Sequence, residues 1–223
     1  MKKTATLLGA TGLIGGHLLD ILKNDPSFDE VRIVVRRPLE ISNPKVKVVV
    51  VDFEDEAQFK SAMEDSDVVF CAVGTTQKKV KGDKHAYRKI DFDIPVNAAK
   101  HCIKYGCKQF LIVSSFGADS KKKGFYLKLK GEVEDALIEK MHPTVGFDSL
   151  SIFRPSLLLG KRSEKRLAED IGQFFSKLLK VLTPGNIKPT EGEKVAQAMV
   201  AVSKLNKKGV EVYHYKEMKE LVG

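Results

Sequence analysis

The stretch TATLLGATGLIGG, residues 4–16, decides the fold of this chain. Residues 4–8 are apolar or β-branched, as in a buried strand, and an amphipathic helical pattern runs over residues 13–23. Gly9, Gly12 and Gly15 lie at the junction, where glycine allows a sharp turn and a close approach of the backbone to a ligand. The free N–H groups at a helix N-terminus attract anions, so this order of strand, glycine-rich turn and helix predicts a dinucleotide-binding loop.

Short segments rich in Val and Ile alternate with helical patterns along most of the chain. Nearly continuous apolar strands are typical of a parallel sheet that is covered on both faces. We expect strands over residues 4–8, 31–35, 46–51, 68–72, 110–113 and 150–153, and helices over residues 13–23, 56–63, 94–105 and 126–140. This alternation predicts an α/β fold of the Rossmann type, a doubly wound parallel sheet with the strand order 3-2-1-4-5-6.

The last third of the chain changes character. It suggests helices over residues 164–182 and 190–204, then a short strand over residues 210–213 and a closing helix. Thr190 is the expected N-cap of the second helix, with Glu193 completing a capping box. We expect a single domain over residues 1–223, in which about residues 155–223 form a small helical cap on the substrate side.

The bulk properties narrow the class of protein. The chain has 223 residues and a formal net charge of +9. It contains no apolar run of the roughly 20 residues that a membrane span needs and no signal-peptide pattern, so we expect a cytoplasmic protein. The cysteines Cys71, Cys102 and Cys107 form no CxxC motif and no metal-ligand spacing, which argues against a disulfide framework and against a metal site.

The residues after the second strand bear on the choice of cofactor. A protein specific for NADH usually has an acidic residue there for the ribose 2′-hydroxyl, but this chain has Arg36 and Arg37. A guanidinium can bind a 2′-phosphate, so the pair favours NADPH over NADH, although both arginines could simply be solvated loop residues. Asp52 is expected beside the adenine, and Gly74 and Thr75 are expected in the loop beneath the cofactor.

Candidate catalytic residues follow the fifth strand. Ser114 and Ser115 lie at its carboxyl end, and Tyr126 and Lys130 are four residues apart, on one face of the next helix. A nearby ammonium stabilises a phenolate, so Tyr126 could exchange a proton with a carbonyl or alcohol oxygen while a serine holds that oxygen. Lys130 would also bond the nicotinamide ribose, and the sequence leaves open which serine acts.

With these motifs in place, the chain resembles the short-chain dehydrogenase/reductase superfamily, in its atypical or extended branch, and most of all the Tat-interacting-protein oxidoreductase group. The resemblance rests on GATGLIG (residues 9–15), FCAVGTT (70–76), VSSFGAD (113–119), YLKLKGEVE (126–134) and IFRPSLLLG (152–160). It implies NADPH as cofactor, a catalytic set of Ser114 or Ser115 with Tyr126 and Lys130, and possible binding to a protein partner. The expected cofactor contacts are Gly9, Thr11, Gly12, Leu13, Ile14, Arg36, Arg37, Asp52, Phe53, Val73, Gly74, Thr75, Tyr126, Lys130 and Pro155.

Three functions follow as hypotheses. The first is an NADPH-dependent carbonyl reductase. The second is a cofactor-binding regulator or interaction protein without turnover, and the third is an enzyme of the nucleotide-sugar epimerase or dehydratase type. The third is disfavoured because only about 70 residues follow the sixth strand, fewer than a large substrate domain needs.

The distribution of the positive charge indicates which kinds of ligand and partner the chain could bind. Basic clusters follow the second, fourth, fifth and sixth strands, at residues 36–37, 78–81, 121–123 and 161–166. Loops after parallel strands meet at one edge, so we expect a positive rim around the cofactor cleft, suited to NADPH and to an anionic substrate. No basic helix face suits a nucleic-acid groove, and no nucleic-acid partner is expected. The helices over residues 94–105 and 126–140 are a candidate homodimer face, by the resemblance.

Overall fold

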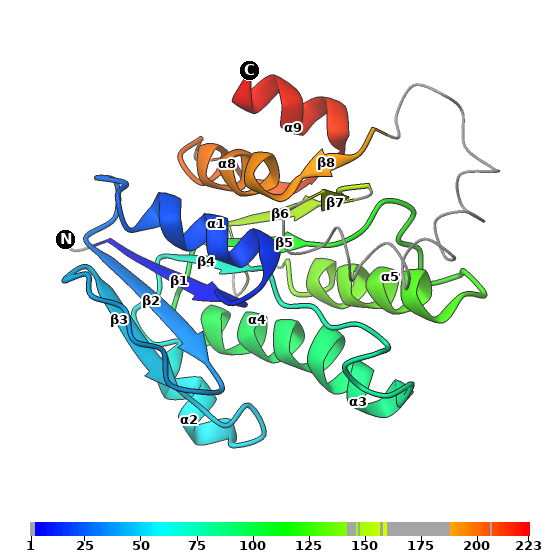
Figure 1. The fold of residues 1–223 in the computed structure, drawn as a ribbon, viewed down its shortest axis with the longest axis horizontal. Coiled ribbons are helices and arrows are strands. Elements are labelled where there is room, and N and C mark those ends of the chain that lie inside the picture. The colour runs from blue at the N-terminus through cyan, green and yellow to red at the C-terminus, as the bar shows by residue number, and fades with distance from the viewer. Residues whose placement is uncertain (1–2, 142–145, 147, 157, 160–187, 206) are drawn as a thin grey trace.

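The computed structural model describes residues 3–141, 146, 148–156, 158–159, 188–205 and 207–223. Its main feature is a parallel sheet of seven strands in the order β3-β2-β1-β4-β5-β6-β9 (Figure 1). The predicted order 3-2-1-4-5-6 is confirmed, and β9 adds a parallel strand beside β6. The strands are β1 (Thr4–Leu8), β2 (Glu30–Val35), β3 (Val46–Val50), β4 (Val68–Cys71), β5 (Gln109–Val113), β6 (Ser149–Phe153) and β9 (Gly209–Tyr213).

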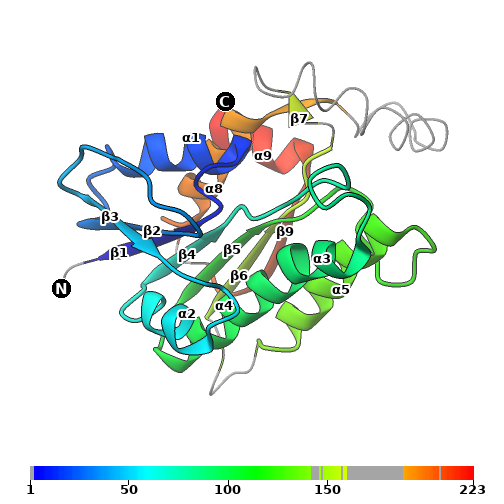
Figure 2. The ribbon, with the colours of Figure 1, turned by 60° about the horizontal axis from the view of Figure 1, so that its bottom comes forward.

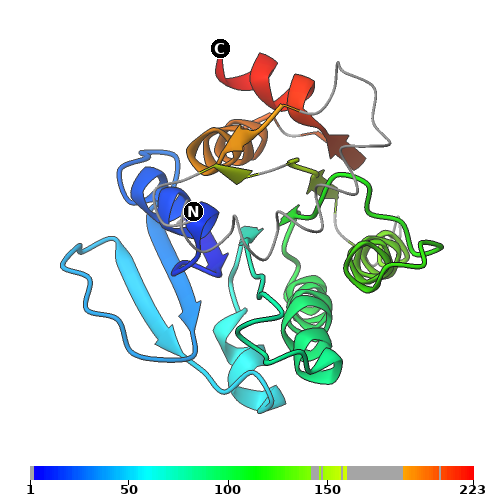
Figure 3. The same ribbon diagram turned by 45° about the vertical axis from the view of Figure 1, so that its right-hand side comes forward.

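Helices cover both faces of this sheet. One face carries α1 (Leu13–Leu22), α8 (Gly192–Val202) and α9 (Tyr215–Val222) (Figure 3). The other face carries α2 (Glu56–Ala62), α4 (Ile94–Lys104) and α5 (Phe125–Ile138) (Figure 2). Helix α4 is entered through α3 (Lys84–Arg88) and a π-helical turn, η1 (Lys89–Asp93). Such π-helical turns often accompany functional sites.

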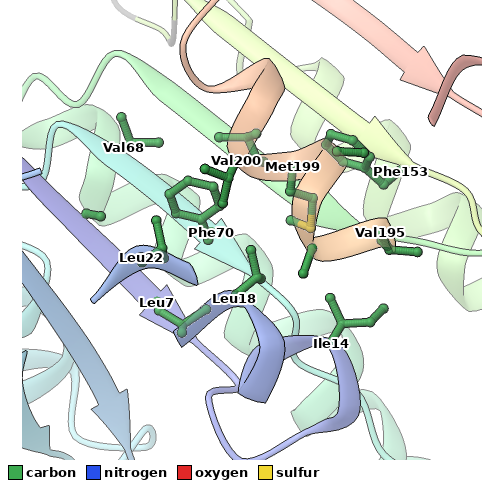
Figure 4. Packing of buried hydrophobic residues seen from close by; sticks show 14 of the residues in the cluster. Leu7, Ile14, Leu18, Leu22, Val68, Phe70, Phe153, Val195, Met199 and Val200 are labelled. Carbon is green, nitrogen blue, oxygen red and sulfur yellow. The ribbon is translucent and has the colours of Figure 1, made fainter. Parts of the chain in front are cut away.

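The strands are apolar along their length because both faces are buried. Successive side chains on a strand point to opposite faces, so Leu7 packs with α1 and α8 while Leu8 packs with α2 and α4. On the first side, Phe70 of β4 meets Leu18 of α1 and Met199 of α8 (Figure 4). Helix α8 is thus part of the core of the Rossmann body.

The C-terminal region differs from the expectation in one detail. Thr190 was expected to cap a helix, but it is paired with Leu158 in a small two-stranded sheet, β7 (Leu158–Leu159) and β8 (Thr190–Glu191). Helix α8 therefore begins at Gly192, its N-cap Glu191 makes no side-chain cap bond, and the predicted capping box is wrong. The predicted helix over residues 164–182 lies outside the described residues. Within the expected cap over about residues 155–223, α8, β9 and α9 are instead built into the sheet and its core; a substrate-side cap formed by the rest of this range stays a prediction.

The cysteines give a second correction. Cys102 near the end of α4 is bonded to Cys107 in a disulfide, whereas the sequence argued against one; Cys71 is free and buried. The helix ends just before Gly106, whose positive φ of 71° turns the chain back. This turn lets the Cys107 amide donate to the Cys102 carbonyl at 3.0 Å, which brings the two side chains together. Sequence spacing alone does not reveal such a turn.

Candidate functional site

The glycine-rich turn joins β1 to α1 and presses against the end of β4. Gly9 has a positive φ of 87°, and a Cβ on it would lie 2.5 Å from the Ala72 carbonyl oxygen. A Cβ on Gly15 would lie only 2.0 Å from the Gly9 carbonyl oxygen. Both positions therefore require glycine, and the helix begins as close to the strand as its backbone allows.

The N-terminus of α1 is open to an anion. Its N-cap, Gly12, makes no side-chain cap bond, and its first turn contains no acidic residue. Thr11 and Gly12 are exposed, Leu13 is half-buried, and Ile14 anchors the turn in the core. The first amides of a helix have no partner within it and carry partial positive charge, so this turn fits the diphosphate of a dinucleotide.

A cleft of about 680 Å³ opens beside the ends of β2 and β3. Its lining includes Arg36, Asp52, Phe53 and Asn97, and Arg37 next to it is exposed. Phe53 packs edge-on against Phe59 with ring centroids 4.8 Å apart. This cleft has an aromatic wall, a carboxylate and a guanidinium, which suits an adenosine carrying a phosphate.

The loop after β4 is held between the glycine turn and the π-helical turn. It contains Val73, Gly74 and Thr75, which the sequence placed beneath the cofactor. The Thr75 amide donates to a carboxylate oxygen of Asp91 at 2.8 Å. The Tyr87 hydroxyl donates to the Thr75 carbonyl oxygen at 2.9 Å. One residue of α3 and one of η1 thus fix the backbone of this loop.

The two candidate serines have different surroundings. The Ser114 hydroxyl donates to the buried Glu134 carboxylate on α5, which also pairs with Arg154, its Nε lying 3.0 Å from Oε1. Among the described residues, the Ser115 hydroxyl makes one long contact of 3.4 Å, to the Phe116 carbonyl oxygen. Ser114 is thus engaged in an internal network, whereas Ser115 has most of its hydrogen-bonding capacity left.

Pro155 lies beside these serines, at the carboxyl end of β6. It is buried, and its carbonyl oxygen accepts from the Phe116 amide at 2.9 Å. The ends of β5 and β6 are thereby tied together next to the serine pair.

Tyr126 and Lys130 lie on α5 facing the loop after β4. Tyr126 is half-buried, while Lys130 is buried with its Nζ 3.0 Å from Oδ1 of Asp91. Burial alone would lower the pKa of Lys130, but the Asp91 carboxylate outweighs it and raises that pKa. Lys130 therefore stays a cation. Cys71 is close by, and burial raises the pKa of its thiol to about 11, so the thiol is neutral.

Three functional candidates were missed from the sequence: Asp91, Glu134 and Arg154. Glu134 had a visible signal, because positions 126, 130 and 134 share one helix face. Asp91 had none, since a π-turn cannot be recognised from the apolar spacing around it.

The expected basic rim is partly described. The clusters at residues 78–81 and 121–123 are exposed around the same edge, together with Arg36 and Arg37. The cluster at residues 161–166 lies outside the described residues.

Within the described part of the chain, no group of three His, Cys, Asp or Glu side chains could hold a metal ion, and no helix is long and apolar enough to cross a membrane. The predicted dimer face on α4 and α5 stays a prediction.

Known proteins share this sequence pattern. The profile of a family described as NAD(P)H-binding matches residues 9–143, more than half of the chain, from the glycine turn through α5. The chain belongs to the NAD(P)H-binding family. This membership agrees with the open helix N-terminus, the cleft beside the ends of β2 and β3, and the loop after β4, all within the matched residues.

Individual relatives support the assignment. Protein FMP52, mitochondrial, of Candida albicans is 32% identical over 200 residues, covering 87% of this chain and 85% of the relative. Protein HTATIP2 of Rattus norvegicus is 37% identical over 177 residues, covering 78% of this chain and 70% of the relative. The resemblance to the Tat-interacting-protein group is therefore confirmed.

Solved structures share the fold. The UDP-N-acetylglucosamine 4-epimerase from Methanobrevibacter ruminantium M1, in complex with UDP-N-acetylmuramic acid, has a TM-score of 0.72 at 19% identity. The match covers 96% of this chain and 77% of that chain. At this identity the likeness extends to the Rossmann architecture alone.

Proposed function

We propose that this protein is an NADPH-dependent oxidoreductase of the carbonyl reductase type, with Tyr126 as proton donor. One observation carries the proposal: Lys130 is held as a buried cation on the same helix face as Tyr126, beside the loop that follows β4. A buried lysine is rare unless it is paired or functional. Here it lies at the carboxyl edge of the sheet, where α/β proteins bind ligands.

In this proposal each residue of the site has its own role. A bound dihydronicotinamide supplies a hydride to a carbonyl carbon. Tyr126 gives its hydroxyl proton to the carbonyl oxygen, and Ser115 donates a hydrogen bond that orients this oxygen. We assign this role to Ser115 because the hydroxyl of Ser114 already donates to Glu134. Lys130 stabilises the negative charge that Tyr126 acquires.

The proposed preference for NADPH rests on the cleft beside the ends of β2 and β3. Arg36 lines it, Arg37 is exposed next to it, and a guanidinium can bond a 2′-phosphate through two N–H groups. The exposed lysines around the same edge would favour a substrate that carries a carboxylate or phosphate.

The experiment is a screen of NADPH oxidation by the purified protein over aldehydes and ketones, half of them carrying a carboxylate. We expect turnover with at least one compound and its loss in Tyr126→Phe, while NADPH affinity stays near that of the wild type. Tyr105→Phe is the matched control, because its hydroxyl bonds Glu64 at 2.7 Å, away from the sheet's carboxyl edge. Full turnover in Tyr126→Phe would exclude its catalytic role. Tight NADPH binding with no turnover over the whole panel would favour a cofactor-dependent interaction protein instead.

A further inference from the structure

Asp91 is a buried carboxylate next to the proposed proton donor and has no assigned role. It lies in the π-helical turn η1 and is 1% exposed. One of its oxygens is 3.0 Å from the Lys130 ammonium, and the other accepts from the Thr75 amide at 2.8 Å. Burying a carboxylate costs several kcal/mol unless charge and hydrogen bonds offset the cost. This carboxylate is therefore held in one position by two different elements.

Among the residues that the structure describes, three titratable groups lie near this ion pair. Tyr126 comes from α5, Tyr87 from α3 and Cys71 from β4. Burial, followed by the Asp91 carboxylate, raises the pKa of Tyr87, and burial raises the pKa of Cys71 to about 11. Both groups are therefore neutral at physiological pH. The ion pair itself carries one positive and one negative charge, and both act on the Tyr126 hydroxyl.

Charged groups farther along these elements already have partners or contact solvent. On α5, Glu134 is paired with Arg154, and Glu132 is paired with Arg88 from α3. Lys84 of α3 is exposed and lies over the neighbouring ring of Phe125, 5.7 Å from its centroid. Solvent screens such exposed charges far more than a buried pair.

We propose that Asp91 is a positioning residue that balances the Lys130 ammonium, so that the ion pair places little net charge beside the Tyr126 hydroxyl, and so biases the site toward carbonyl reduction. The proposal rests on the proposed function. In reduction the O–H bond of Tyr126 breaks and its proton goes to the carbonyl oxygen, while the hydride and its electron pair form the new C–H bond. The products are the alcohol, the oxidised coenzyme and a tyrosinate, which takes a proton back from solvent. The reverse reaction starts from tyrosinate, and an unbalanced ammonium would favour that form.

The test is a titration of phenolate absorbance against pH, which needs neither cofactor nor substrate. The Tyr126 signal is the difference between each protein and the same protein carrying Tyr126→Phe. We expect Asp91→Asn to move the appearance of the Tyr126 phenolate about one pH unit lower. The alkaline limb of the NADPH-dependent reduction profile should move by a similar amount. The variant Asp91→Asn/Lys130→Gln, which carries neither charge, should return the phenolate titration close to that of the wild type.

A matched control separates this effect from the loss of a buried ion pair as such. Asp25 is also buried and lies 2.5 Å from the Lys204 ammonium, on the loop between α1 and β2. Asp25→Asn should leave the Tyr126 titration in place. If Asp91→Asn does not fold, Lys130→Gln alone should move the titration upward, and Asp91→Asn added to it should move the titration back down.

The outcomes are separable. An unchanged Tyr126 titration in Asp91→Asn, or an equal shift in Asp25→Asn, overturns the role of Asp91 even if the protein reduces carbonyls. The expected shifts in a protein that reduces none of the compounds support the charge balance and refute the proposed reaction.

Discussion

Substituting Gly15 by alanine tests whether the tight turn is what positions the dinucleotide. The added Cβ would lie 2.0 Å from the Gly9 carbonyl oxygen, whereas an ordinary contact begins near 3.4 Å. The helix start and the strand end must therefore separate by about 1.4 Å. Such a displacement breaks or lengthens the hydrogen bonds from the first helical amides to a diphosphate. Each bond to a charged group contributes about 1.5–3 kcal/mol, so losing one weakens NADPH binding about 10- to 150-fold.

The assay is calorimetric titration of NADPH into wild type, Gly15→Ala and Gly16→Ala, with urea unfolding of each. Gly16 is the matched control because a Cβ there would meet only the Ala10 carbonyl oxygen, at 3.9 Å. Gly16→Ala should bind NADPH normally and gain about 0.5–1 kcal/mol of stability, since alanine favours a helix over glycine. Wild-type affinity in Gly15→Ala would refute the reasoning, as would equal losses in the two variants.

Three further results are expected. The double variant Arg36→Ala, Arg37→Ala should weaken NADPH binding about 10- to 100-fold; an equal loss of NADH affinity in the same calorimetric titrations would contradict a 2′-phosphate contact. Glu134→Gln should lower the free energy of unfolding in urea by about 2–3 kcal/mol, because the half-buried Arg154 loses its carboxylate partner; a loss below about 0.5 kcal/mol would contradict the network. Burial raises the pKa of Asp25, but its hydrogen bonds to Lys204 and Ser27 lower it by more, so the pKa lies below the ordinary value of an aspartate. The ionised Asp25 therefore stabilises the fold fully above about pH 4, and this stabilisation is lost as the pH falls through the lower pKa of the folded state. The difference in free energy of unfolding between the wild type and Asp25→Asn should narrow in acid. A difference that stays constant as the pH falls would contradict a stabilising Asp25–Lys204 pair.

Much of the fold could be predicted from local pattern. All six expected strands of the sheet and the four helices that flank them are present, and no end differs from its expected position by more than two residues. The reason is that a strand buried on both faces must be apolar along its length, and that glycine is the only residue which fits the first turn. The cofactor family follows from the same stretch, residues 4–16.

The errors lie where distant segments meet. Thr190 has a good capping sequence but is paired with Leu158, a strand partner that its neighbours do not reveal. Cys102 and Cys107 approach each other through a turn at Gly106. For Thr190, the strand contact outweighs a capping preference that is worth only about 1 kcal/mol.

By itself, the sequence determined the Rossmann sheet, the glycine turn and the presence of Ser114, Ser115, Tyr126 and Lys130, because periodicity and residue type carry that information. Only the tertiary structure decided how these side chains are used. It engages Ser114 with Glu134 and pairs Lys130 with Asp91. Such pairings depend on which elements pack together across the sheet edge, and buried charges make those contacts energetically decisive.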